Sequence, residues 1–475
     1  MDYGFDLMQI DDGWQRSSRD FSDQRGGSYS AGMAKTAATI TGAGMRAGLW
    51  FIPFGWDPKS DVFNGHQDWF VHRKDGGGLY SVQWGGTCLD MTHPEARDLL
   101  RRTVTKICGT WGYKYIKIDG LWTGLAAEIL YADPRYRDDK LGDAVFHDPA
   151  QTNVESYRNG LRLVREAAGK DVYVLGCNTA QNYRTLGASF GLVDGMRVGQ
   201  DIGVKWPQIL NAATMSTRLY FLHNRVWHND PDCLMLRDPM TLTQARTWGT
   251  WIGLSGQLNI VSEWLPGLPE EKLDIVRRTM PNHGLNARPL DLLEQPKLAR
   301  VWHLGDARGS QRRDVLGFFN WDNKETTISL ELTRAGLDPK ASYHGFDYWN
   351  DRFISPISGK LDVNLPAHGC ADIALVPDDS TARIVSTSRH VSQGAVDLMN
   401  ETWDPAAKTL TATSKVVAND PYQIRVAFPL GLTLEKVTIV NGAGATISIE
   451  QEPQHARITI RSQQTGTLNW KASFK

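Results

Sequence analysis

Residues 4–15 read GFDLMQIDDGWQ, a short apolar run that ends in two adjacent carboxylates, a glycine and a tryptophan. Successive side chains of a strand point to opposite faces, so at least one of Asp11 and Asp12 belongs to the turn after the strand. Buried carboxylates need hydrogen-bond donors. The pair therefore predicts either a turn or helix cap, or a site where the hydroxyl groups of a ligand supply the donors. We expect Trp14 to brace the turn.

The first 290 or so residues repeat this unit, because short apolar strands alternate with amphipathic helical segments. The expected strands are Phe5–Ile10, Ala47–Pro53, Lys114–Ile118, Val172–Gly176, Gly195–Val198, Arg225–His228 and Leu258–Val261, and the expected helices are Ala31–Met45, Pro94–Cys108, Val154–Ala168, Pro207–Phe221, Leu242–Ile252 and Glu270–Thr279. This alternation predicts a parallel sheet covered by helices. Polar residues gather at the carboxyl ends of the strands, which favours a (β/α)8 TIM barrel. A doubly wound sheet is the competitor, but no glycine-rich phosphate loop follows any strand.

Seven strands are expected where a complete barrel has eight. Since the strand of residues 5–10 opens the chain, we expect the first barrel strand and its helix to be missing. The chain is then either a fragment or begins at an internal methionine.

From about residue 297 the pattern changes to alternating segments broken by turns, which are typical of antiparallel strands. A linker is expected at Asp378–Thr381. We therefore predict three domains: a catalytic barrel over residues 1–292, a C-terminal β-sandwich over 293–378 and a second all-β domain over 379–475.

The composition disfavours several classes of partner. Lys and Arg number 52 against 53 Asp and Glu, so neither nucleic acid nor an anionic membrane surface is expected to bind. The five cysteines have no disulfide-framework or metal-site spacing. No apolar run approaches the roughly 20 residues of a membrane span. No signal peptide is present at residue 1, but the expected truncation leaves cytoplasmic and exported locations both open. The 17 tryptophans indicate core packing or, at some positions, platforms for sugar rings.

Two further strand ends carry residues suited to chemistry. Lys117 and Asp119, two apart, lie on one face of a strand, where the lysine would hold the carboxylate ionised as a nucleophile requires. A structural ion pair at a barrel rim is the alternative. Arg197 and Asp201 follow another strand and fit a salt bridge or an acid/base group equally well. Two carboxylates at one barrel mouth are typical of glycoside hydrolysis, although other hydrolyses use them too.

Taken in order, QIDDGWQ, AGLWFIPF, YKYIKIDG, LGCN, MRVGQDI and HNDPDCLML resemble the melibiase clan, the α-galactosidases and α-N-acetylgalactosaminidases of glycoside hydrolase families 36 and 27. The resemblance covers roughly residues 4–377. It implies that Asp119 is the nucleophile and Asp201 the acid/base. It also implies the substrate-binding residues Asp11, Asp12, Trp50, Lys117, Cys177, Arg197 and Asp232, with the Asp11–Asp12 pair on O4 and O6 of galactose.

The implied reaction is hydrolysis of terminal α-galactosyl residues from oligosaccharides with retention, which places the two carboxyl groups about 5–5.5 Å apart. No metal or organic cofactor is expected. An α-N-acetylgalactosaminidase is the first alternative, left open by the small residues Gly187, Ala188 and Ser189. A carbohydrate-binding or inactive truncated homologue is the second. The family often has Trp and Asn where this chain has Ile118 and Leu121, a departure that bears on the contacts around Asp119 and so on the exact substrate. The sequence specifies neither the natural glycan nor the oligomeric state.

Overall fold

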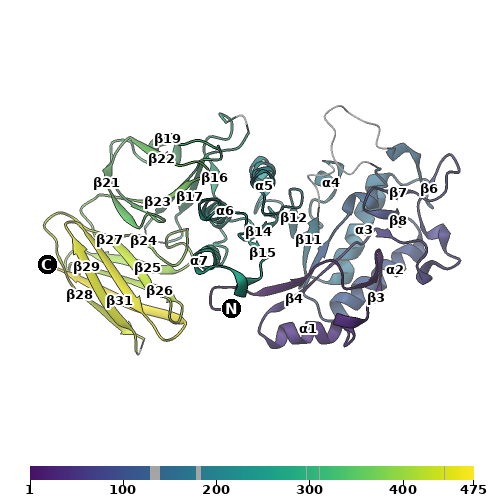
Figure 1. The fold of residues 1–475 in the computed structure, drawn as a ribbon, viewed down its shortest axis with the longest axis horizontal. Helices are drawn as coiled ribbons and strands as arrows, with labels where there is room; N and C mark the ends of the chain where they lie inside the picture. Colours follow the sequence, from purple (N-terminus) through teal and green to yellow (C-terminus); the bar gives the residue numbers. More distant parts are fainter. Residues whose placement is uncertain (129–139, 178–182, 296, 310, 443) are drawn as a thin grey trace. The chain divides into compact units, whose positions relative to one another are not determined.

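The computed structural model describes residues 1–128, 140–177, 183–295, 297–309, 311–442 and 444–475, and Figure 1 shows its ribbon. The chain divides into two compact units. The first contains Met1, Phe5–Asp201 and Arg218–Asp232, and the second contains Asp2–Gly4, Ile202–Thr217 and Cys233–Lys475. Each unit is considered by itself.

A six-stranded parallel sheet organises the first unit. Its strands, in spatial order, are β1 (Leu7–Ile10), β4 (Arg46–Phe51), β9 (Tyr115–Ile118), β11 (Tyr173–Cys177), β12 (Gly195–Arg197) and β13 (His228–Asp230). The spatial order follows the sequence order without reversal. A doubly wound sheet reverses its strand order at a switch point, whereas a (β/α)8 barrel does not. The sheet therefore confirms the predicted parallel arrangement and winds in the manner of a barrel.

The helices of the first unit connect these strands: α1 (Met33–Gly42), α2 (Pro94–Thr105), α3 (Asn153–Ala168) and α4 (Tyr183–Ala188). The ends of α3 follow from its sequence. Thr152 and Glu155 form a capping box at its start, each side chain bonding the other's backbone N–H. Gly169 follows its last residue with φ of 86°, a conformation that glycine adopts readily.

The predicted strand Arg225–His228 lies three residues further along, as β13. The chain is still turning where the strand was expected. Asn224 has a left-handed φ of 56°, and the backbone N–H groups of Arg225 and Val226 both donate to Leu222 O. Backbone N–H groups that already donate within a turn cannot also donate to a neighbouring strand. Pairing with β12 therefore begins only at His228.

Small antiparallel sheets that the sequence pattern did not predict lie in the βα connections. They are β2 (Gln15–Ser17) with β3 (Asp20–Gln24), β5 (Gly55–Trp56) with β8 (Gly86–Cys88) and β7 (Ser81–Val82), and β6 (His72–Arg73) with β10 (Ala144–Val145). Strands of two to five residues are too short for a period-2 pattern to be legible. Trp14, Trp50, Trp56 and Trp122 are fully buried in this unit.

The second unit contains α5 (Trp206–Arg218) except its last residue, and then β14 (Cys233–Leu234), α6 (Leu242–Ser255), β15 (Ile260–Val261) and α7 (Glu270–Thr279). Strands β14 and β15 pair in parallel. Helix α6 has almost no exposed face, since Ala245 and every residue from Thr247 to Ser255 are buried.

Antiparallel β-structure follows in two groups of strands, each made of two sheets. The first comprises β16 (Arg288–Pro289), β17 (Val301–Asp306), β18 (Arg313–Phe319), β23 (Cys370–Pro377), β20 (Tyr343–Asp347) and β21 (Arg352–Ile357), with β19 (Thr326–Glu331) paired to β22 (Lys360–Leu365). The second comprises two four-stranded sheets, β24 (Arg383–Thr387), β27 (Tyr422–Ala427), β30 (His455–Arg461) and β29 (Thr446–Glu452), and β25 (Leu398–Asp404), β26 (Thr409–Val416), β31 (Gly466–Phe474) and β28 (Leu434–Asn441). Each of the two groups of strands has its own apolar core. The three domain boundaries stay a prediction.

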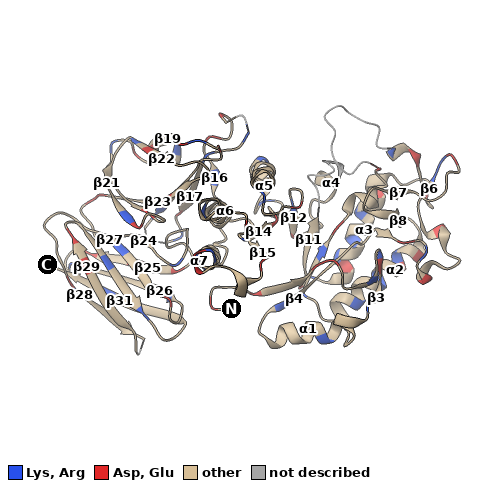
Figure 2. Ribbon diagram, in the orientation of Figure 1, with Lys and Arg blue, Asp and Glu red and all other residues tan. Residues whose placement is uncertain are grey.

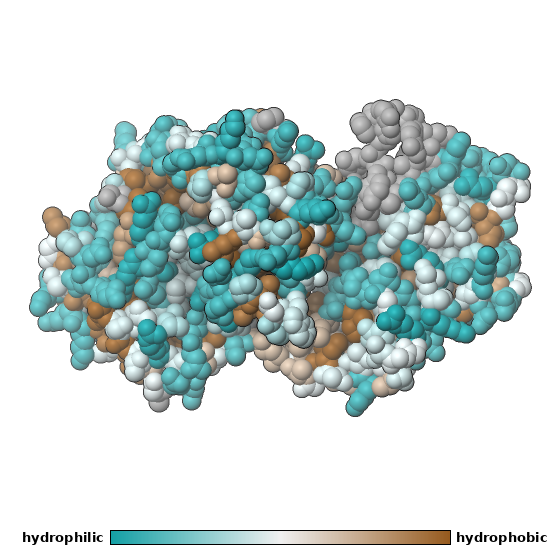
Figure 3. Space-filling model, in the orientation of Figure 1, coloured by the Kyte–Doolittle hydropathy of each residue, from teal (hydrophilic) through white to brown (hydrophobic). Residues whose placement is uncertain are grey.

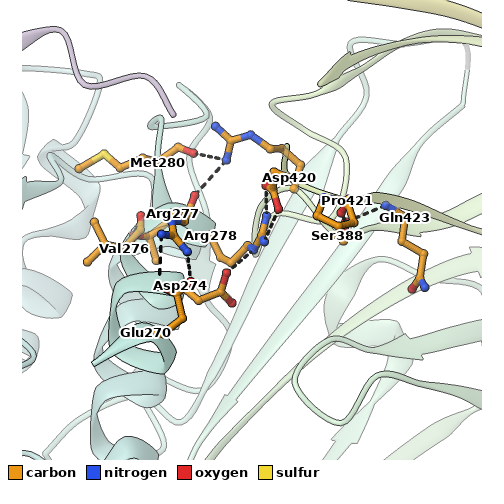
Figure 4. A network of polar contacts seen from close by, with 12 residues as sticks. Glu270, Asp274, Val276, Arg277, Arg278, Met280, Ser388, Asp420, Pro421 and Gln423 are labelled. Atoms are coloured by element: carbon orange, nitrogen blue, oxygen red, sulfur yellow. Dashed lines mark hydrogen bonds and ion pairs between the residues drawn. The ribbon is translucent and has the colours of Figure 1, made fainter. Parts of the chain in front are cut away.

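Polar contacts fasten α7 to the last β-structure inside the second unit (Figure 4). The guanidinium of Arg278 donates to both carboxylate oxygens of Asp420, over 2.6 and 2.8 Å. Arg389 donates to the carbonyls of Arg277 and Met280, which closes the end of the helix. Two parallel bonds between an arginine and a carboxylate fix the mutual geometry of their elements as well as stabilising them.

The surface is mixed in character. Lys and Arg are interspersed with Asp and Glu along the ribbon (Figure 2), and the visible face is mostly hydrophilic with scattered apolar patches (Figure 3). All five cysteines are free. In the described parts of the chain, no helix combines the length and the hydrophobicity that crossing a bilayer requires.

Candidate active site

Asp119 stands directly after β9, at the carboxyl edge of the parallel sheet. Its carboxylate accepts a hydrogen bond from the indole N–H of Trp50 (Nε1 to Oδ2, 3.0 Å) and another from the backbone N–H of Gly120 (2.7 Å). Gly120 has φ of 63°, so the turn that presents the carboxylate suits a glycine. Only 7% of Asp119 is exposed. The side chain is thus held in one orientation within an almost water-free setting.

Burial raises the pKa of Asp119, and the Lys117 ammonium, the Trp50 hydrogen bond, the Gly120 N–H and Arg197 all act in the opposite direction. Lys117 acts as the sequence predicted, since it lowers this pKa, but burial outweighs it. The ion pair of Lys117 is with Asp11, whose Oδ2 lies 3.0 Å from Nζ. The expectation that Lys117 by itself keeps Asp119 ionised is therefore too simple.

The two carboxylates that open the chain sit in a tight turn after β1. The backbone N–H of Asp12 donates to Asp11 Oδ1 (2.9 Å), and Gln15 Nε2 donates to Asp12 Oδ1 (2.6 Å). Gly13 adopts φ of 114° and its N–H bonds Gln15 Oε1 (3.0 Å). The side chain of Asp11 is still 52% exposed, so its carboxylate can accept further donors.

Trp14 anchors this turn from below, as predicted. It is fully buried, and its indole N–H donates to Trp50 O over 2.7 Å. Its ring meets that of Trp111 edge-on, with centroids 5.6 Å apart. Trp14 therefore links the turn to the backbone of Trp50, and the indole of Trp50 in turn links that strand to Asp119.

Arg197, at the end of β12, forms ion pairs with two carboxylates. Its side chain is 2% exposed, and its partners are Asp201 and Asp232 Oδ2 (3.0 Å). Asp201 is 87% exposed at its side chain, although it holds this pair. The structure shows the salt bridge that the sequence offered as one alternative, and the acid/base role of Asp201 stays a prediction.

Cys177, another predicted substrate-binding residue, stands at the carboxyl edge of the sheet. It is buried at the end of β11, faces Arg197 in register, and its Sγ lies 4.0 Å from Arg197 Nη1. Burial raises the pKa of the Cys177 thiol, and Asp119 and Asp201 both raise it further. The Cys177 thiol therefore lies beside the Arg197 guanidinium and within the electrostatic field of Asp119 and Asp201.

Asp230 is a further candidate site residue, which the sequence reasoning did not select; it lies two residues before Asp232, the residue that was selected. It is 1% exposed, faces Arg197 in the strand register, and accepts the backbone N–H of Asp232 over 2.8 Å. Burial raises its pKa to about 6. Asp232 itself adopts a left-handed φ of 78° in the turn. Its position could have identified it, because Asp230 is the last residue of β13 and is paired in register with Arg197.

Two of the three small residues considered for an acetamide pocket bond other parts of the protein, whereas a Cβ added at Gly187 would meet no atom within 4 Å. Ala188 O accepts from Arg158 Nη1 (2.8 Å), and the Ser189 hydroxyl bonds Tyr157 OH (2.7 Å) and Thr185 O (2.6 Å). Ser189 is fully buried.

Comparison with known proteins decides the kinship of this arrangement. Residues 1–127 match the Melibiase family model, and this segment contains β1, β4 and β9 with the Asp11–Asp12 turn, Trp50, Lys117 and Asp119. The chain carries a melibiase domain. Residues 299–374 match the alpha galactosidase C-terminal beta sandwich domain. This melibiase-type chain is accordingly a glycoside hydrolase, a TIM-barrel domain followed by a β-sandwich.

Solved structures share the fold of this melibiase-type chain. A GH27 β-L-arabinopyranosidase from Geobacillus stearothermophilus aligns with a TM-score of 0.58 and 15% identity, covering 79% of this chain and 90% of that one. The α-galactosidase of Saccharomyces cerevisiae aligns with a TM-score of 0.55 and 13% identity over 79% and 90%. Alpha-galactosidase I from Mortierella vinacea aligns with 0.53 and 14% over 79% and 88%. At such identities the likeness concerns the fold.

Proposed function

We propose that this chain is a retaining exo-glycosidase that releases terminal, non-reducing α-D-galactosyl residues from oligosaccharides or glycoconjugates. The observation that carries the proposal is the setting of Asp119. An almost completely buried carboxylate, fixed by the Trp50 indole and the Gly120 N–H and lying in the field of Lys117, suits a nucleophile. The half-exposed Asp11 carboxylate offers acceptors for sugar hydroxyl groups at the same strand edge.

In the first step Asp119 attacks the anomeric carbon while Asp201 delivers a proton to the departing oxygen. The anomeric C–O bond to the leaving group breaks, and a bond from the anomeric carbon to Asp119 forms. In the second step Asp201 takes a proton from water, which displaces Asp119 and regenerates the anomeric configuration of the substrate.

Asp201 must change its protonation state within this cycle. It is the acid that protonates the leaving oxygen in the first step and the base that takes a proton from water in the second. Its side chain is 87% exposed beside the Arg197 guanidinium, so a ligand and water can both reach it.

The proposal is tested with 4-nitrophenyl α-galactoside and with raffinose. We expect turnover by the wild type, product of retained configuration by proton NMR at early times, and a loss of kcat of at least about 10³-fold in Asp119→Asn. Asp98→Asn, on the outer helix α2, serves as the control and should match the wild type. Full activity in Asp119→Asn, or a product of inverted configuration, would refute the assignment.

The same panel separates the other candidates. Faster turnover of 4-nitrophenyl α-N-acetylgalactosaminide would indicate the acetamide-bearing sugar. Faster turnover of 4-nitrophenyl β-L-arabinopyranoside would indicate a pentose, the substrate named for the Geobacillus stearothermophilus structure. Binding of raffinose without turnover of any substrate would indicate a carbohydrate-binding protein.

A further inference from the structure

Two bulky residues beside the candidate site have backbone conformations that side chains rarely adopt. Arg19 lies in the turn between β2 and β3 with φ of 66°, and Trp84 lies in the turn between β7 and β8 with φ of 61°. Each left-handed residue carries a conformational cost, and such residues gather at functional sites. Neither residue belongs to the family-derived set of site residues.

The two residues hold each other. The Arg19 guanidinium carbon lies 4.6 Å from the centroid of the Trp84 ring, and Arg19 Nη2 also donates to the Trp84 carbonyl. The arginine passes Gly86, where an added Cβ would lie 3.5 Å from Arg19 Cδ. A cation over an indole face combined with a hydrogen bond to the same residue fixes the ring relative to the backbone. The β2–β3 and β7–β8 hairpins are thereby joined.

The Trp84 ring approaches the turn that directly follows the candidate nucleophile. Its Cζ3 lies 3.6 Å from the point where a Cβ at Gly120 would be, and Gly120 is the residue that donates to Asp119. Trp122 supports the ring from within the protein, with centroids 5.8 Å apart. Burial lowers the pKa of Arg19, whereas Asp12 and Asp119 raise it, which places the guanidinium in the field of both carboxylates.

Exposure distinguishes Trp84 from the other indoles of the site. Trp84 is 47% exposed although Arg19 covers part of it, while Trp50 and Trp122 are each 1% exposed. A large apolar ring left in solvent beside a reacting carboxylate is suited to contact with a ligand. In an exo-acting glycosidase the terminal sugar occupies the enclosed part of the site, and the remainder of the substrate extends towards solvent.

We infer that Trp84, held in place by Arg19, is the platform on which the sugar of the leaving group stacks. Its flat face would meet the C–H groups of a pyranose ring, and Arg19 would act as the positioning residue for the indole. This inference rests on the proposed exo-glycosidase function and adds a determinant of substrate preference to it: glycosidic leaving groups that are themselves sugars.

The decisive comparison uses substrates with and without a leaving sugar. For Trp84→Ala we expect KM for raffinose to rise about tenfold, with a much smaller change for α-galactosyl fluoride, whose leaving group is a single atom. Trp84→Phe, which keeps a ring, should recover most of the loss. Phe221→Ala removes an aromatic of equal exposure, 47%, from η7 (Tyr220–Leu222), which precedes the opposite end of β13, and is the matched control.

Arg19→Met tests the positioning role, because it removes the cation but keeps much of the stem. Like Trp84→Ala, it should raise KM for raffinose. In the double variant Arg19→Met/Trp84→Ala, KM should be little higher than in Trp84→Ala. Equal KM changes for raffinose and α-galactosyl fluoride in Trp84→Ala, or no change for either, would overturn the platform.

The failure of the platform and the failure of the proposed function remain distinguishable. Turnover of α-galactosyl fluoride by the wild type tests the function alone. Binding of raffinose and galactose by Asp119→Asn, measured by calorimetry, tests the platform without turnover: adding Trp84→Ala should weaken raffinose binding about tenfold and galactose binding far less. Unchanged raffinose affinity in that double variant rejects the platform whatever the enzyme hydrolyses.

Discussion

The indole N–H of Trp50 donates to Asp119 Oδ2 over 3.0 Å, from the strand next to the one that carries the carboxylate. Trp50 is fixed in turn by the paired-carboxylate turn, since Trp14 donates to its carbonyl. The candidate nucleophile is therefore oriented by a side chain on another strand. Its pKa depends on the hydrogen bonds that Trp50 and Gly120 donate to it.

Loss of the Trp50 donor should shift the pH dependence of catalysis. A nucleophile acts when ionised, so activity falls as the pH drops through the pKa of Asp119, which burial already raises. Trp50→Phe removes a contribution that lowers this pKa, so the acid limb of kcat/KM should move to higher pH. Trp251→Phe on α6 is the control, because Trp251 is equally buried and its indole nitrogen has no hydrogen-bond partner among the described residues. An unmoved limb in Trp50→Phe would contradict the role of this bond.

Removal of the Lys117 charge should move the acid limb further in the same direction. Lys117 is the largest of the influences that lower the pKa of Asp119, ahead of the Trp50 hydrogen bond. Lys117→Met also leaves Asp11 without its ion-pair partner, so KM should rise as well. The order of the two shifts in pH–rate profiles checks the prediction; a larger shift in Trp50→Phe than in Lys117→Met would reverse the assigned ranking.

The buried Asp230 should make the folded state less stable as the pH rises. Its folded pKa, about 6, lies above its usual value of 3.8, so its contribution to stability is complete below pH 3.8 and is lost as the pH rises through 6. The loss amounts to about 1–3 kcal/mol. In Asp230→Asn this component disappears, so the change in unfolding free energy between pH 4 and pH 7 should differ from that of the wild type. Urea denaturation at both values measures it, and identical changes in the two proteins would count against the assignment.

Breaking the Arg278–Asp420 pair should weaken the second unit substantially. The side chains are 14% and 10% exposed, and removing one member of such a buried pair leaves the other uncompensated, at a cost of about 3–5 kcal/mol. Asp420→Asn should lower the denaturation midpoint accordingly. Glu270→Gln removes the exposed partner of Arg277 on the same helix and should change the midpoint little. Similar midpoints for both variants would show that burial does not govern this pair.

Sequence reasoning reached much of the fold because its signals are local. The alternation of apolar strands and amphipathic segments predicted the parallel sheet, and six of the helices lie within a few residues of the expected ranges. The strand at Arg225–His228 was misplaced, because the turn that holds Asn224 competes with extension there. The short hairpins that carry Arg19 and Trp84 were not predicted, since strands of two to five residues are too short to show a period.

The sequence by itself determined which residues follow the strand ends, because chain order fixes that Asp11, Asp119 and Asp201 come where apolar strands stop. Tertiary structure alone decided their chemistry. Burial raises the pKa of Asp119 against the effect of Lys117, the ammonium pairs with Asp11, and Arg197 binds both Asp201 and Asp232. Charge and hydrogen-bond energies depend on distances between strands and on the exclusion of water, and a linear pattern of residues specifies neither.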